Sequence, residues 1–315
     1  AGADGRRICG SEGNSGRVRL VSLPSGTVHD VLQLNQGSWR DSYSGDLAYD
    51  TERHVLYVVD QANFRVAVFD TRSRKLIASV RVGRLPFKLA LSPDKRRLDV
   101  TNLAMFEYQP VPSADPKNAR ATGLPFPAFG FPSKDAETGA KRATGQGDVD
   151  VPGLGDPNVD QSNSLCVVDI SSPSAPTVVK FVRTGEPFGP NSVGGAGPSG
   201  VVAMGGAIYV ANSNQDTITI VDVVTLQARG QIQLRIPGLE AYRGILPIRL
   251  ALDIANGRLL IAEAGINAIG VVDLSTNKLV GHLPAGWFPA AVTVDRGAIF
   301  VANTKGNGTG PNASK

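Results

Sequence analysis

Short apolar runs recur along this chain at a regular spacing. Each run is five residues long and ends in Asp, Asn or Glu: LYVVD at 56–60, LDVTN at 98–102, IYVAN at 208–212, LLIAE at 259–263 and IFVAN at 299–303. Where no long loop intervenes, the repeat length is about 40–45 residues, which is typical of one β-propeller blade. Internal repetition is therefore the main structural signal of the sequence.

Each run belongs to a unit with four predicted strands. An inner segment precedes the run, as in PFKLALSPDK or PIRLALDIANG, and a strand ending in Asp follows it, as in FRVAVFD or AIGVVD. A further strand, such as KLIASVRV or KLVGHL, completes the unit. Apolar residues recur at period two, which favours strands over helices. A single small sheet cannot bury both of its faces, so the pattern predicts an all-β fold, a β-propeller of stacked four-stranded antiparallel blades.

Five blades can be counted. The inner strands of the complete units contain, at one shared register position, Asp46, Lys88, Gly200 and Arg249. A fifth unit contains Ala291 at that position and supplies only two strands, while residues 17–23 and 27–34 resemble a third and a fourth strand. Joining these halves would make one composite blade and close a ring of five. The alternative is that further blades lie beyond Lys315.

One segment interrupts the repeat. Residues 106–163 fall between the second and third strands of one blade and are rich in Pro, Gly and charged residues, without strand periodicity. A loop of this length is usually functional or disordered. We therefore expect a single domain over residues 1–315, with a long irregular insertion that projects from the rim of a blade.

The composition narrows the range of partners. Lys and Arg number 32 against 28 Asp and Glu, and this small excess argues against a dedicated nucleic-acid-binding protein. No apolar run reaches 18 residues, so no membrane-spanning helix is expected.

Two further features bear on the compartment. The start AGADGRR has no initiator Met and resembles a mature chain after signal-peptide cleavage, which predicts export to the periplasm or the exterior of a bacterial-type cell. Cys9 and Cys166 are compatible with one disulfide outside the cytosol and equally with two free thiols.

Strands such as LDVTN and IYVAN, with TITIVD after the latter, resemble those of YVTN-repeat propellers. Over residues 190–312 the similarity is closer, notably in EAGINAIGVVD and TKGNGTGPN, and extends to bacterial two-domain proteins. In those proteins a YVTN propeller precedes a phosphoesterase domain of the alkaline-phosphatase superfamily. The resemblance implies a ring of seven blades, the number usual for the family, and a phosphoesterase domain in the parent protein.

This chain departs from that pattern, because neither the additional strands nor the phosphoesterase domain of the family follows. Such a phosphoesterase needs clustered Asp and His residues for two metals and a Ser or Thr nucleophile. The three histidines, His29, His54 and His282, fall in separate blades. We therefore expect no phosphoesterase site within this chain.

The first candidate site is the mouth of the central channel. The shared register position of the inner strands holds the charged residues Asp46, Lys88 and Arg249, together with small residues in the other two blades. These side chains either form a polar funnel that attracts an anion or simply hydrate the channel.

The second candidate is a ligand-binding face formed by the loops that lead into the inner strands. Trp and Tyr beside Arg are enriched at interaction hot spots and also suit stacked sugars. The six residues predicted on this face are Trp39, Arg40, Tyr242, Arg243, Trp287 and Phe288. Aromatic residues of this kind also anchor cores.

A third candidate lies in the insertion. The stretch GDVDVPGLGDPNVD carries Asp148, Asp150, Asp156 and Asp160, and several carboxylates are what calcium prefers. The spacing differs from that of the helix–loop–helix calcium loop, and a solvated acidic loop is the alternative. No cofactor is required by any motif in the chain.

These observations predict a non-catalytic exported propeller that acts as a binding or scaffold module for a protein, a polysaccharide or another polymer. One alternative is the propeller portion of a larger phosphoesterase. A further alternative is a lactonase-like enzyme, for which Glu263 and Arg249 are the candidate residues. Whether the parent protein is an enzyme stays open at this point.

Overall fold

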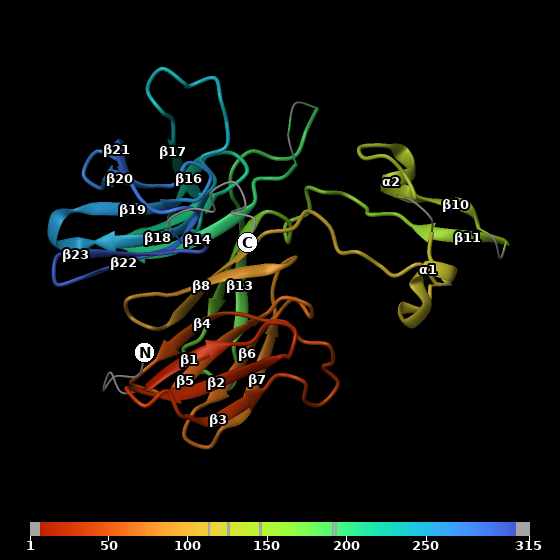
Figure 1. Ribbon diagram of the computed structural model, residues 1–315, viewed down its shortest axis with the longest axis horizontal. Coiled ribbons are helices and arrows are strands. Elements are labelled where there is room, and N and C mark those ends of the chain that lie inside the picture. Colours follow the sequence, from red (N-terminus) through yellow and green to blue (C-terminus); the bar gives the residue numbers. More distant parts are fainter. Residues whose placement is uncertain are drawn as a thin grey trace, which may run out of the picture.

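A computed structural model describes residues 7–306, except for 113, 125, 126, 145, 146, 191 and 193. The fold is all-β, and four of its sheets are four-stranded and antiparallel, consistent with propeller blades (Figure 1). The first blade consists of β4 (Ser44–Asp50), β5 (Val55–Asp60), β6 (Arg65–Asp70) and β7 (Lys75–Arg81). The second consists of β8 (Pro86–Leu91), β9 (Arg97–Asn102), β12 (Ser164–Asp169) and β13 (Thr177–Arg183).

The third and fourth blades follow the same order. They consist of β14 (Pro198–Met204), β15 (Ala207–Asn212), β16 (Thr217–Asp222) and β17 (Ala228–Gln233), and of β18 (Pro247–Asp253), β19 (Arg258–Glu263), β20 (Ala268–Asp273) and β21 (Lys278–Pro284). The predicted four complete units are thus confirmed. The inner strands β4, β8, β14 and β18 lie next to one another in chain order.

Burial explains why the second strand of each unit is so apolar. Every residue of β5 and of β15 is buried, because each blade packs both of its faces against neighbours. Tyr57 of β5 belongs to the same apolar core as Val100 and Cys166 of the next blade. The outermost strands are more exposed, which accounts for their weaker hydrophobic pattern.

The predicted composite blade is wrong for the described residues. The first sheet has three strands, β1 (Arg7–Ser11), β2 (Arg17–Ser22) and β3 (Val28–Gln33), in the order β1-β2-β3. Strands β22 (Pro289–Asp295) and β23 (Ala298–Asn303) pair with each other in a separate two-stranded sheet. A strand has only two edges, and those of β2 are taken by β1 and β3, so β23 has no free edge of β2 to join.

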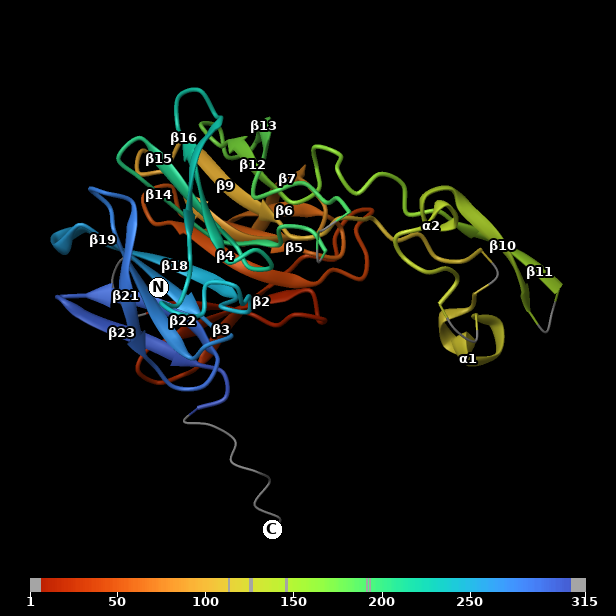
Figure 2. The ribbon, with the colours of Figure 1, turned by 90° about the horizontal axis from the view of Figure 1, so that it is seen from above.

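The insertion is more ordered than expected. It contains the 3-10 helix η1 (Pro116–Asn118), the helices α1 (Ala119–Thr122) and α2 (Lys134–Thr138), and a hairpin of β10 (Gly139–Thr144) and β11 (Gly147–Pro152). The prediction of a wholly irregular segment is therefore wrong, and low hydrophobicity concealed the hairpin. Figure 2 shows this segment projecting well away from the sheets, as predicted.

Both cysteines are free thiols. Cys9 lies in β1 and Cys166 lies in β12, and burial raises the pKa of both.

Across the described residues, no helix is long and apolar enough to span a membrane.

Candidate functional site

One end of the sheets carries most of the predicted site residues. We call it the front face and define it by the connections that lead into the inner strands, residues 34–43, 82–85, 184–197, 234–246 and 285–288. Second strands run antiparallel to inner strands, so each second strand ends at this face. The front face therefore also carries every connection between a second and a third strand.

A repeated backbone hydrogen bond builds the front face. The residue directly before each inner strand accepts from the residue directly after the second strand, as in Leu103 N to Leu85 O at 2.9 Å and Ala264 N to Leu246 O at 3.0 Å. Leu85, Leu246 and Phe288 have positive φ values of 52°, 54° and 57°. A left-handed conformation is unfavourable for such residues, so the surrounding bonds must impose it.

The insertion is rooted in the front face. Arg84, in a front-face connection, donates from Nη1 to the carbonyl oxygens of Met105 and Asp156 and to Oγ of Ser162. One guanidinium thus holds both ends of the insertion. We call residues 103–163 the arm, and the arm projects from the same end as the predicted binding residues.

Further bonds connect the arm to the next front-face loop. Asn158 donates from Nδ2 to Phe188 O at 2.9 Å, and its Oδ1 accepts from Phe188 N at 2.9 Å. Oδ1 of Asn163 accepts from Gly197 N at 3.1 Å. In these bonds, side chains of the arm satisfy backbone groups of the front-face loop that would otherwise bond to water. They therefore fix the base of the arm.

An aromatic cluster covers the base of the arm. The rings of Phe106 and Phe131 lie 5.2 Å apart edge to face, and Phe131 lies 5.1 Å from Phe188 of the front-face loop. Phe106 is buried, whereas Phe131 is 44% exposed and Tyr108, at 6.4 Å from Phe106, is 74% exposed. The sequence-based prediction did not include this cluster, although FEYQP at 106–110 and PFGP at 187–190 are aromatic signals beside the insertion.

The two predicted residues nearest the first blade have local structural roles. The Arg65 guanidinium lies 4.2 Å from the centroid of the Trp39 ring. Arg65 itself is wholly buried, so Trp39 covers a buried cation. Arg40 is exposed and donates to the carbonyl oxygens of Gly37 and Trp39.

Tyr242 and Arg243 are presented to solvent. Tyr242 is 72% exposed, and no hydrogen bond or ion pair engages the Arg243 side chain within the described part of the chain. Arg243 lines a cavity of about 280 Å³ with polar neighbours. These are Glu186, Ser192, Gln215, Thr217, Gln231, Gln233 and Arg235.

Trp287 and Phe288 lie in the last front-face connection. Trp287 is 43% exposed, and Lys305 Nζ lies 5.4 Å from the Phe288 ring centroid. Lys305 and Phe288 therefore form a second aromatic–basic pair on the front face, after that of Arg65 and Trp39. This pair lies beside the two-stranded sheet of β22 and β23.

The structure brings the three charged channel residues together. Nη1 of Arg249 lies 3.1 Å from Oδ2 of Asp46, and Nζ of Lys88 lies 3.6 Å from Oδ1 of Asp46. Desolvation is the main cause that lowers the pKa of Lys88, and the nearby Arg249 charge adds to it, while Asp46 opposes both. Two cations share one carboxylate here, which leaves the cluster net positive.

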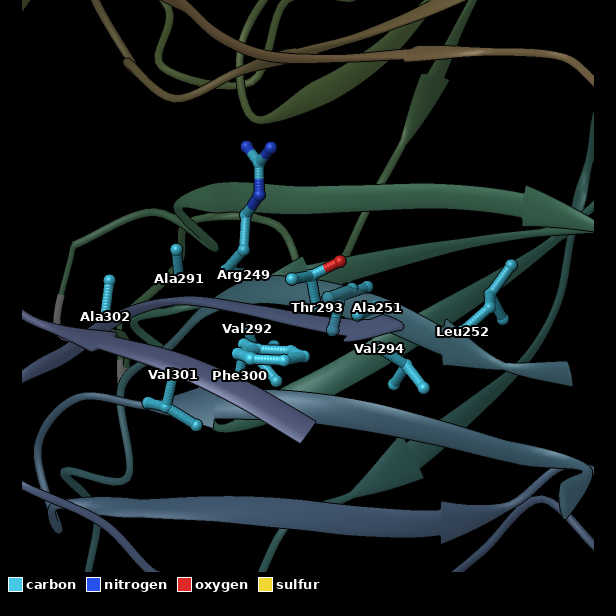
Figure 3. Close-up of a pocket in the computed structure, with 11 residues that line it drawn as sticks. Arg249, Ala251, Leu252, Ala291, Val292, Thr293, Val294, Phe300, Val301 and Ala302 are labelled. Atoms are coloured by element: carbon cyan, nitrogen blue, oxygen red, sulfur yellow. The ribbon is translucent and has the colours of Figure 1, made fainter. Parts of the chain in front are cut away.

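A cavity of about 570 Å³ extends from this cluster along the last sheet. Figure 3 shows Arg249 extending from β18 away from the apolar residues Val292 and Phe300. Phe300 is 55% exposed, whereas the corresponding Tyr57 of the first blade is fully buried. The cavity therefore combines one cationic end with an apolar floor.

The fourth blade contains a buried acid–base pair. Oε2 of Glu263 lies 2.6 Å from Nδ1 of His282, and the other ring nitrogen lies 3.2 Å from Arg235 O. Burial raises the pKa of Glu263 above its usual value, against the opposing effect of His282. Glu263 is wholly buried and Arg249 bonds Asp46, so the two candidates for lactone hydrolysis engage different partners.

The four aspartates of the insertion are dispersed. Asp148 and Asp150 lie on β11, and Asp156 and Asp160 lie closer to the root of the arm. Among the described residues, no group of three or more His, Cys, Asp or Glu side chains is placed to hold a metal ion.

Comparison with known sequences gives one family match. A search of curated proteins finds no match to the chain. Residues 159–184, which include β12 and β13, match the model of the LVIVD repeat. The second blade therefore contains an LVIVD repeat, a repeat associated with β-propellers.

Proposed function

We propose that this chain is a non-catalytic binding module that holds a protein or polysaccharide partner on its front face. The observation that carries the proposal is the arm, which is anchored at that face by Arg84 and Asn158 and exposes aromatic rings at its base. A segment of this length costs conformational entropy to order. Its fixed base and exposed rings support a role in contact with another molecule.

The chemistry of the front face supports a polar partner with flat or apolar surfaces. Tyr108 and Tyr242 expose rings, and Arg243 offers an unengaged guanidinium beside a cavity lined by amides. Exposed Tyr with Arg provides stacking and hydrogen bonding together, which both glycans and protein hot spots use.

Paired variants on opposite faces test this proposal. Tyr108→Ala with Tyr242→Ala removes two rings that are 74% and 72% exposed on the front face. Val224→Ala with Ile254→Ala removes side chains that are 86% and 70% exposed at the other end of the sheets, the back face. Val224 lies in the turn between β16 and β17, and Ile254 begins the 3-10 helix η2 (Ile254–Asn256). All four sites are exposed, so both double variants should fold.

The probes are a panel of bacterial polysaccharides and the envelope proteins of the source cell, each presented to immobilised protein. We expect the front-face variant to weaken the retained interaction by about tenfold or more, and the back-face variant to leave it unchanged. Equal losses from both variants, or a loss from the back-face variant alone, would contradict the proposal. We also propose that the protein is exported, and fractionation of the source cell tests this part of the proposal.

A phosphoesterase domain in the parent protein is a second candidate. The finer similarity to YVTN propellers over residues 190–312 supports it, although residues 307–312 lie outside the described part of the chain. The test is the intact mass of the protein from its source, together with hydrolysis of p-nitrophenyl phosphate. A mass well above 33.0 kDa with metal-dependent hydrolysis supports this candidate, and a mass of 33.0 kDa contradicts it.

A further inference from the structure

A polar cavity lies between the first, three-stranded sheet and the first complete blade. Its volume is about 330 Å³. It is lined by residues of the four strands β1, β2, β3 and β4 and of the two turns 51–54 and 71–74. The turns 51–54 and 71–74 belong to the back face, so this cavity is separate from the front-face site. We call it the inter-sheet cavity.

Positive charge dominates the inter-sheet cavity. Three guanidinium groups, those of Arg7, Arg72 and Arg74, line it against the single carboxylate of Asp30. Arg74 forms an ion pair with Asp30 through Nε and Oδ2. The guanidinium groups of Arg7 and Arg72 therefore have no carboxylate partner among the lining residues, and Asp70, which interacts with Arg72, lies outside the lining. A doubly charged anion would balance them.

The remaining polar groups are suited to hydrogen bonding with such an anion. Oη of Tyr49 lies 3.4 Å from Nδ1 of His54 and 3.3 Å from Oγ1 of Thr71, which fixes the Tyr49 hydroxyl and the His54 ring in the cavity wall. The His29 ring has no hydrogen-bond partner among the described residues and lines the same cavity. Tetrahedral oxyanions are bound by converging Arg, His and hydroxyl groups of this kind.

One wall of the cavity is apolar. Leu20 is 7% exposed, and Cys9, its partner across β1 and β2, packs in the same apolar core. A ligand that filled the cavity would place an uncharged body against this wall and its anionic group at the guanidinium groups. Ligand sites commonly combine an apolar lining with a few convergent polar groups in this way.

We propose that the inter-sheet cavity binds a small phosphate monoester, with Arg7 and Arg72 as the main anion-binding side chains. A phosphate monoester carries close to two negative charges near neutral pH, which matches the two guanidinium groups that have no carboxylate partner among the lining residues. The organic part of the ligand would contact Leu20 and Cys9. This binding is independent of the partner held at the front face.

The experiment measures binding of phenyl phosphate to the full chain by titration calorimetry. We expect saturable binding with one site, which Arg72→Gln and Arg7→Gln each weaken by about tenfold. Arg296→Gln is the matched control, because it makes the same charge change at a side chain that is 92% exposed and does not line the cavity. His29→Gln, which changes no guanidinium, should also weaken binding and provides a second route if an arginine variant fails to fold.

Three results would overturn the proposal. The first is no saturable binding of phenyl phosphate, and the second is an equal loss of affinity from Arg296→Gln and Arg72→Gln. The third is retention of the protein on phosphatidic-acid vesicles that phenyl phosphate does not displace, because the phosphate group would then be that of a lipid surface. Displacement from the vesicles by phenyl phosphate supports the proposal.

Discussion

Arg65 and Asp60 form an ion pair in which neither side chain has any solvent exposure, with Nε and Oδ2 2.8 Å apart. Further hydrogen bonds complete the site, since Arg65 also donates to Ser79 Oγ and to Leu34 O at 2.8 Å each. The Trp39 ring covers the guanidinium. A buried charge is tolerated only when it is paired and hydrogen-bonded, and this pair meets both conditions.

Arg65→Met should therefore destabilise the protein strongly, because it leaves the Asp60 carboxylate buried without a cation. The expected loss of unfolding free energy is about 3–5 kcal/mol. The double variant Asp60→Asn with Arg65→Met removes both charges and should recover part of that loss. Urea unfolding of the single and double variants measures the difference, and equal losses in both would contradict the coupling.

Asp99 stands at the strand position that Tyr57 and Tyr209 occupy in neighbouring blades. Its side chain is 1% exposed, and burial raises its pKa from 3.8 to about 7. Between these values the folded protein holds a proton that the unfolded chain releases. The free energy of unfolding should therefore fall as pH rises from about 4 to about 7. Above about pH 7 this loss should stay constant.

Asp99→Asn removes this titration. The variant should match the wild type near pH 4 and exceed its stability at pH 8 by a few kcal/mol at most, since one pKa unit is about 1.4 kcal/mol. Asp222→Asn is the contrasting control, because hydrogen bonds from the Thr225 and Val224 backbone lower the pKa of Asp222. Asp222→Asn should lower the free energy of unfolding at neutral pH and should lower it less in acid. Thermal unfolding across this pH range distinguishes the two.

Gly270 leaves room for the buried carboxylate of the fourth blade. A Cβ at this position would clash with Oε1 of Glu263 and lie 2.8 Å from its Cδ. Gly270→Ala should therefore cost about 1–3 kcal/mol of stability. The control is Gly230→Ala on β17, where the nearest atom to the added Cβ is 3.9 Å away. We expect that change to alter stability by about 0.5 kcal/mol or less, and similar effects at both glycines would refute the explanation.

The pKa of Lys88 reports on the charges of Asp46 and Arg249 beside it. Asp46 raises its pKa against desolvation and Arg249, so Asp46→Asn should lower the pKa of Lys88 further. Arg249→Gln should act in the opposite direction, because it removes a like charge and frees Asp46 to pair with Lys88. The pH dependence of amine modification at Lys88, followed by mass spectrometry, measures both shifts. Shifts of the same sign in the two variants would contradict the opposite effects of Asp46 and Arg249 on the pKa of Lys88.

The blades were predictable because their strands carry a strong period-two pattern and repeat. The inner-strand register followed from that repeat, which is why Asp46, Lys88 and Arg249 were expected together and are found together. In contrast, β1 was missed because RICGS is short and half polar. The β10–β11 hairpin was missed because its strands bury few apolar side chains.

Contacts between distant segments account for what else the sequence did not reveal. Trp39 looked like an exposed anchor, but its partner Arg65 lies in another strand and is visible only in the folded chain. The inter-sheet cavity draws residues from β1, β2, β3, β4 and two turns, so no local motif marks it. The aromatic rings at the base of the arm, Phe106, Phe131 and Phe188, are likewise far apart in the sequence and come together only in the folded chain.

The way in which the arm is attached has a consequence for evolution. Arg84 binds both Met105 and Asp156, so the two ends of the arm meet at one anchor and the blade beneath does not depend on what lies between them. Loop length at such a point can change at little thermodynamic cost. Chains that share these blades should therefore diverge most, in both length and composition, between these two anchor points. Recognition could then be altered by exchange of the arm while the sheets stay the same.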